Sequence, residues 1–180
     1  MSSNNGIPRT GCRHGSGFSL LELVVVIAII SVLLAVAIVK LWPLQVEAER
    51  VAMEQVLGSL RSALGIKVAD YFVRNDVAGV RSLTDTNPMD RLSELPKNYL
   101  GALDGANPGS IEGGSWYFDI PGKTLVYQVR NQDYFRGGAG SPARARFTIR
   151  VVYEERGRGR NEIAGVTLDA LEPYRWIQKD

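Results

Sequence analysis

The 180-residue sequence contains one cysteine and one histidine. They are Cys12 and His14, and both fall within the first seventeen residues. A single cysteine excludes a disulfide within one chain. If residues 1–17 are removed, the rest has no thiol nucleophile, no imidazole for acid–base catalysis and no Cys/His zinc site. An enzyme built on the remaining chain would rely on carboxylates, hydroxyls, lysine and arginine.

The chain also lacks an excess of charge of either sign. It has 21 Lys+Arg and 19 Asp+Glu residues, which leaves a formal net charge of +2. This total is too small to indicate a polyanion-binding protein. With 45% hydrophobic and 22% charged residues, the composition is that of a folded protein, which excludes a disordered tail.

A long apolar run follows the first seventeen residues. No residue from Leu23 to Val39 is charged, and the run counted from Phe18 is 22 residues long. At about 1.5 Å per residue such a helix is roughly 33 Å long, enough to cross a hydrocarbon core of about 30 Å. Residues 1–17 are polar, with two arginines and no acid, which is typical of a cytoplasmic leader. The run therefore predicts a membrane-spanning helix.

Two features mark the N-terminal edge of this run. Gly17 precedes Phe18 at the boundary, and Glu22 places a carboxylate inside the apolar stretch. A carboxylate at the centre of a membrane helix costs about 2.5–3.5 kcal/mol, and less near the helix end. A cut between Gly17 and Phe18 would create a positive α-amine one helical turn before Glu22, in the same chain or in a neighbour. Cleavage would therefore create an ion-pair partner for the carboxylate.

The same residues resemble a known processing signal. The segment GFSLLELVVVIAIISVLLAVA, which begins at Gly17, is similar to the cleavage and methylation signature of type IV pilins and type II secretion pseudopilins. The resemblance implies that a prepilin peptidase cuts after Gly17 and methylates Phe18, and that Glu22 helps to set subunit register during assembly. It also implies a leader, a transmembrane and assembly helix, and a periplasmic head, at residues 1–17, 18–42 and 43–180.

Other interpretations of the segment stay open. Ser19 and Glu22 fit a capping box at a helix start, which is compatible with the pilin signature. The run could also be a secretory signal cut after Ala37, behind the small residues of Ala35-Val36-Ala37, or a signal anchor that is not cut. Cys12 is disfavoured as a lipid-attachment site because no hydrophobic region precedes it.

Beyond the run, the sequence predicts a second, amphipathic helical stretch. Pro43 interrupts the apolar pattern, and Trp42 suits a membrane boundary. Residues 46–72 then carry apolar side chains at three- and four-residue steps. Gly58 and Gly65 weaken this helix by about 1 kcal/mol each relative to alanine, which indicates either flexibility or close packing. The charged residues assigned to its other faces are Glu47, Glu49, Arg50, Glu54, Arg61 and Lys67.

The rest of the chain predicts a loop region followed by strands. Residues 75–114 are rich in turn residues and predict loops with one short helix near 89–95, and their scattered acids fit no calcium loop. Alternating patterns then predict strands of an antiparallel sheet of about four strands, with one face on the amphipathic helix. The predicted fold class is therefore α+β, as the pilin resemblance also implies. The strands are expected at 115–120, 124–130, 144–154 and 163–171.

The basic residues are unevenly placed. Eight arginines and three acids lie between Arg130 and Arg160, a local net charge of +5. This cluster could bind DNA phosphates or an acidic neighbour in a filament, or it could be a solvated strand face with a basic hairpin loop. No aromatic residue is interleaved closely enough with the arginines to form a convincing stacking platform for single strands.

The resemblance predicts a structural subunit, a pseudopilin or minor pilin, without catalytic activity, cofactor or metal. Its expected partners are a prepilin peptidase, other pilins or pseudopilins and an inner-membrane assembly platform. Its expected location is the bacterial inner membrane, as a single-pass protein with a periplasmic head, and then a filament. A calcium site of the kind found in some pseudopilins is doubtful, because only Asp169, Glu172 and Asp180 lie near the C-terminus.

Two other functional hypotheses remain. In one, the hydrophobic segment serves only for targeting, and the chain is a signal-anchored or secreted periplasmic binding module or enzyme. In the other, the arginine cluster makes the chain a DNA-binding pilus component for DNA uptake.

Overall fold

The structure, a computed structural model, describes residues 19–156 and 160–177. It divides into two units, residues 1–41 and 42–180. One helix, α1 (Leu20–Val73), contributes to both. Gly17 and Phe18, the predicted cleavage site, lie outside the described residues.

The described part of the first unit is the beginning of α1. Its large apolar side chains are exposed along the whole stretch, from Leu20 at 80% to Leu41 at 56%. By length and composition, α1 includes a stretch that can cross a membrane. Lipid or other apolar helices would remove these side chains from water, which is the favourable state for so much hydrocarbon.

Pro43 lies inside α1 and does not end it. The sequence predicted an interrupted pattern here and a renewed helix from residue 46, whereas the helix is assigned through this position without a break. Proline lacks the N–H group that would bond to the carbonyl of Val39, four residues earlier, so one helical hydrogen bond is lost and the neighbouring ones can remain.

In the second unit, α1 buries one stripe of its surface. The buried residues recur at three-, four- and seven-residue steps, which confirms the amphipathic helix predicted from the sequence. Near the C-terminal end of the helix the stripe is no longer buried, since Phe72 is 41% exposed. The buried stripe consists of Val46, Met53, Leu57, Leu60, Leu64 and Val68.

The main sheet has five strands in the order β1-β2-β3-β5-β6. The four predicted strands are confirmed as β2, β3, β5 and β6, which pair antiparallel in that order. The structure adds β1, which pairs parallel to β2, so the sheet is mixed and larger than predicted. The bounds are Tyr99–Leu103 for β1, Trp116–Asp119 for β2, Thr124–Gln128 for β3, Arg144–Arg156 for β5 and Arg160–Ala170 for β6.

A second sheet has two short antiparallel strands that the sequence did not predict, β4 (Phe135–Gly137) and β7 (Tyr174–Trp176). Their inward side chains form an aromatic group with a strand of the main sheet. The ring of Phe135 stacks on that of Tyr174 with centroids 5.4 Å apart, and Tyr174 meets Phe147 edge-on at 5.9 Å. These contacts fix the small sheet to the core.

The connection between α1 and the sheet contains more regular structure than predicted. A helix, α2 (Val77–Ser82), follows directly after α1, and the side chain of Asp76 caps it by accepting from the amide of Gly79 at 2.8 Å. The helix predicted near 89–95 is a single 3-10 turn at Pro88–Arg91, and residues 92–95 are not helical. Further 3-10 turns lie at Leu83–Asp85, Pro108–Ser110 and Gln132–Tyr134.

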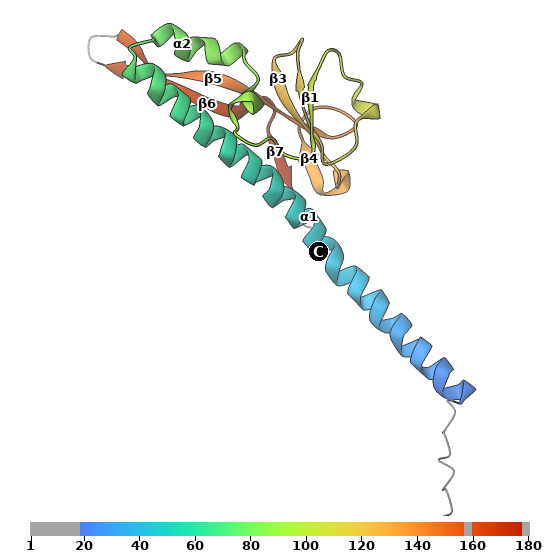
Figure 1. The fold of residues 1–180 in the computed structure, drawn as a ribbon. Helices are drawn as coiled ribbons and strands as arrows, with labels where there is room; N and C mark the ends of the chain where they lie inside the picture. Colours follow the sequence, from blue (N-terminus) through green and yellow to red (C-terminus); the bar gives the residue numbers. More distant parts are fainter. Residues whose placement is uncertain (1–18, 157–159, 178–180) are drawn as a thin grey trace, which may run out of the picture. The chain divides into compact units, whose positions relative to one another are not determined.

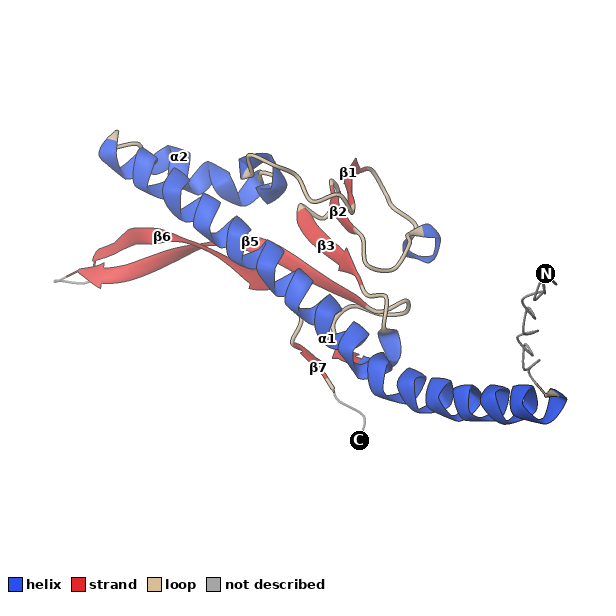
Figure 2. Cartoon of the chain, turned by 60° about the horizontal axis from the view of Figure 1, so that its bottom comes forward, coloured by secondary structure: helices blue, strands red, loops and turns tan. Residues whose placement is uncertain are grey.

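The second half of α1 lies along β5 and β6 (Figure 1). The core between them joins the buried stripe of α1 to side chains from every strand of the main sheet, with Trp116, Leu125 and Phe147 fully buried. Arg61 of α1 donates to the carbonyl of Leu168 at 3.3 Å, at the edge of β6. In the view of Figure 2, β1 and β7 appear on either side of α1.

The two glycines of α1 are not explained by packing within the head. A Cβ atom added at Gly58 or Gly65 would meet nothing within 4 Å, and neither residue has a positive φ. Close packing against the described residues is therefore excluded as their cause, and each position carries the ordinary cost of glycine in a helix.

We expect Gly58→Ala to raise the free energy of unfolding of the full chain by about 0.5–1 kcal/mol, because alanine has less backbone freedom to lose. Leu60→Ala, two residues away and fully buried, should lower it by about 2–5 kcal/mol. Chemical denaturation in detergent, followed by tryptophan fluorescence, measures both. A loss of stability in Gly58→Ala would show that the helix needs glycine at this position.

Candidate functional site

The start of α1 is capped by the residue that precedes it. The hydroxyl of Ser19 accepts a hydrogen bond from the amide of Glu22 at 3.1 Å, and the carbonyl of Ser19 accepts from the amide of Leu23 at 3.1 Å. This is one half of the capping box that the sequence allowed. The reciprocal bond, from the amide of Ser19 to the Glu22 carboxylate, is not formed among the residues that the structure describes.

Glu22 therefore stands as a carboxylate on the first turn of an apolar helix. It lies beside Leu21 and Leu23, which are 73% and 52% exposed. No cation of the described residues forms an ion pair with it. Such a surface can bind other apolar helices, and its single charge favours a partner that brings a positive group to the same end. Gly17 and Phe18, the other two predicted site residues, lie outside the described residues.

A second carboxylate, Glu49, attaches α1 to the sheet. Its Oε1 accepts from the hydroxyl of Tyr127 at 3.0 Å and from the amide of Arg130 at 2.7 Å. Its Oε2 accepts from the amide of Asn131 at 2.9 Å and from the side-chain nitrogen of Asn131 at 2.6 Å. Four donors thus converge on one carboxylate, and all of them come from residues about eighty positions later in the chain.

The helical pattern of the sequence predicted Glu49 on a charged outer face, and this prediction is wrong. Glu49 is three residues after Val46 and four before Met53, so it lies on the buried stripe of α1. A charged residue on an apolar stripe is stable only when donors surround it, and the end of β3 supplies them. The interruption of the stripe by a carboxylate was the signal that could have identified this site.

The environment of this contact shifts the pKa of Tyr127. Burial raises the pKa of its hydroxyl, and the nearby negative charge of Glu49 raises it further. The hydroxyl therefore stays protonated and remains a donor to Glu49 throughout the neutral range. The bond between them joins the beginning of the head half of α1 to the end of a central strand.

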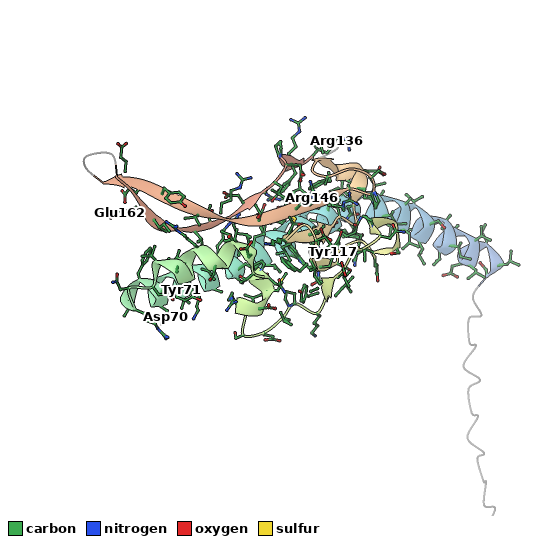
Figure 3. The ribbon with its side chains drawn as sticks, turned by 90° about the horizontal axis from the view of Figure 1, so that it is seen from above. Asp70, Tyr71, Tyr117, Arg136, Arg146 and Glu162 are labelled. Atoms are coloured by element: carbon green, nitrogen blue, oxygen red, sulfur yellow. The ribbon has the colours of Figure 1, made fainter. Side chains whose placement is uncertain are left out.

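The arginine cluster is only partly neutralised. Arg146 forms an ion pair with Glu172, which raises the pKa of the Arg146 guanidinium. Arg130 donates through Nε to the carbonyl of Gly113 at 3.1 Å, and Arg136 donates to the carbonyl of Phe135 at 3.0 Å. Figure 3 shows Arg136 near Arg146, at the other end of the head from Glu162. Arg158 lies outside the described residues.

Grooves flank the head half of α1. One of about 490 Å³ lies between α1 and residues 92–98, with Trp116 and Tyr127 in its wall. Another, of about 660 Å³, lies at the end of α1 beside Phe72, between α2 and the β5–β6 hairpin. Within residues 19–156 and 160–177, no group of three or more His, Cys, Asp or Glu side chains is placed to hold a metal ion.

Comparison with known proteins identifies the N-terminal segment. The family described as the prokaryotic N-terminal methylation motif matches residues 12–38. The chain carries the type IV pilin/pseudopilin signature. The match confirms the resemblance seen in the sequence, and it spans Gly17, Phe18 and Glu22. A long N-terminal helix on a mixed sheet is consistent with a pilin-like arrangement. Neither a curated protein nor a solved structure matches the chain.

We expect Glu49→Ala to lower the free energy of unfolding by about 2–4 kcal/mol, because it leaves four donors without their shared charged acceptor. Glu54→Ala is the matched control. Glu54 is on the same helix and forms only an exposed ion pair with Arg50, so its loss should cost less than about 1 kcal/mol. Denaturation of the full chain in detergent compares them. Equal effects of the two substitutions would contradict the role of Glu49.

Proposed function

We propose that this chain is a structural subunit, a pseudopilin or minor pilin, of a type II secretion pseudopilus or a type IV pilus. Residues 1–17 act as a cytoplasmic leader, residues 18–42 anchor the chain in the inner membrane, and residues 43–180 form a periplasmic head. The observation that supports this most strongly is the methylation motif at residues 12–38, which runs into a helix whose apolar side chains are exposed.

Processing and assembly follow from the N-terminal segment. A prepilin peptidase cuts after Gly17 and methylates the new N-terminal residue, Phe18. The apolar helices of many copies, delivered by the inner-membrane assembly platform, then pack together in a filament. In that apolar environment an isolated Glu22 carboxylate is unfavourable, so it pairs with the N-terminal amine of a neighbouring copy and thereby sets the axial register.

The proposal includes no catalytic role for the chain. The carboxylate that is most heavily hydrogen-bonded among the described residues, Glu49, uses its oxygens to hold backbone amides and side chains of its own head. The competing hypothesis, a signal-anchored or secreted binding module or enzyme, has no comparable support from the site. For the DNA-binding hypothesis, the ion pair between Arg146 and Glu172 reduces the charge that the sequence suggested.

We expect the mature N-terminus to be a methylated Phe18 only when a prepilin peptidase is co-expressed. Intact mass and the N-terminal peptide of the full chain measure this. Gly17→Val should block the cut, because the peptidase acts after a residue without a side chain, whereas Gly15→Val is the control and should be processed. A start at Ile38 would instead identify a secreted protein, and an uncut chain in the presence of the peptidase would identify a simple anchor.

We expect Glu22→Ala to be processed normally and to be lost from filaments by at least about tenfold, since the N-terminal amine of a neighbouring copy reaches Glu22 only in the assembled state. The amount of processed protein in sheared filaments measures the effect. Ser19→Ala separates this role from helix capping, because it removes the cap and keeps the carboxylate. Normal filament levels of Glu22→Ala would contradict the assigned role.

A further inference from the structure

Two arginines lie directly opposite each other in the small sheet. Arg136 of β4 and Arg175 of β7 are paired in the antiparallel ladder, so their side chains leave the same face with Cβ atoms about 4.5–5.5 Å apart. Both residues are exposed. Like charges in directly opposed positions destabilise a ladder unless an anion lies between them. We call these two residues the arginine pair.

No acid of the described residues neutralises the arginine pair. Neither guanidinium takes part in an ion pair there, and the one hydrogen bond of Arg136 goes to the carbonyl of Phe135. The contrast with Arg146 is direct, since that neighbouring arginine has its own carboxylate in Glu172. The arginine pair therefore offers a site for carboxylates from outside the described part of the chain.

A surface of opposite charge lies at the other side of the head. Residues 99–119 contain three acids and neither lysine nor arginine. Two of the acids, Asp104 and Glu112, are exposed in the connection between β1 and β2, and no described cation forms an ion pair with them. Arg130 comes close to this connection, but its guanidinium donates to the carbonyl of Gly113. We call residues 104–115 the acidic connection.

The arginine pair and the acidic connection cannot join within one head as it is folded. The connection leaves β1, the edge strand of the main sheet, whereas β7 belongs to the second sheet and lies on the other side of α1 in the view of Figure 2. Contacts along α1 agree with the figure. Ala52 and Ser59 face the groove on the side of residues 92–98, whereas Arg61 reaches the β6 edge at Leu168. Two different surfaces of one chain that fit each other form a heterologous contact, which repeats from copy to copy.

We propose that the arginine pair of one copy binds Asp104 and Glu112 on the acidic connection of a second copy. This inference rests on the proposed function, because it requires that copies assemble through their apolar helices. The head contact then selects which neighbour is accepted and in which orientation, since complementary exposed charges contribute specificity more than affinity. A contact of this kind weakens as salt rises.

The test is a charge exchange in the full chain, expressed where the wild type forms filaments. One variant carries Arg136→Glu and Arg175→Glu, and the other carries Asp104→Lys and Glu112→Lys. Each variant alone brings like charges together at the contact, so each should enter filaments at least about tenfold less than the wild type. Co-expressed, the two variants should assemble together, because each then meets a neighbour of opposite charge.

The matched control replaces two other exposed arginines, with Arg81→Glu and Arg150→Glu, and should assemble like the wild type. A processed wild type that forms no filament contradicts the proposed function itself. If the wild type assembles and the arginine-pair variant assembles equally well, only the proposed head contact is overturned. Loss of assembly without recovery on co-expression also overturns it, because the partner is then not a second copy.

A cross-link gives an answer that does not depend on charge reversal. With Cys12→Ser, the sequence has no other cysteine, so Arg175→Cys and Glu112→Cys can be introduced in one chain. Oxidation of filaments should link the double variant into multimers that a reducing agent separates. Each single-cysteine variant can form a disulfide with only one other copy, so it should give dimers at most. Monomers only from the double variant would overturn the proposed contact.

Discussion

The packing of α1 on the sheet depends on the hydrogen bonds that the Glu49 carboxylate accepts. This carboxylate joins a helix to the end of a central strand through two backbone amides, a hydroxyl and a side-chain amide. The chain between them closes a loop of about eighty residues, whose ordering costs entropy that the buried core must offset. A charged acceptor at this point fixes both the position of the helix on the sheet and the start of the segment that leads to β4.

Local patterns predicted the elements that are long and periodic. The apolar run, the amphipathic half of α1 and the four antiparallel strands of the main sheet follow from composition and spacing over several residues. The processing signal at Gly17, Phe18 and Glu22 is equally local, and the family comparison confirms the motif that contains them. The roles of these residues remain proposals, because they depend on a peptidase and on neighbouring copies.

The elements that escaped prediction are short or stabilised by distant residues. In β1, Gly101 has a φ of +95° and the pairing with β2 is irregular. The sequence of such an irregular strand shows no clear alternation of apolar and polar residues. Strands β4 and β7 have three residues each and form because Phe135, Tyr174 and Trp176 pack together across the chain. Glu49 was misplaced because its donors lie about eighty residues away, and a helical pattern cannot show them.

The central claim is that Glu49 locks the end of β3 to α1, so that helix and head move as one body from residue 49 onward. Hydrogen exchange of the full chain in detergent tests it directly. The amides of Arg130 and Asn131 lie in a loop, yet we expect them to exchange as slowly as the amides of the main sheet, because both donate to Glu49. Exchange as fast as that of the exposed loop residue Gly105 would contradict the claim.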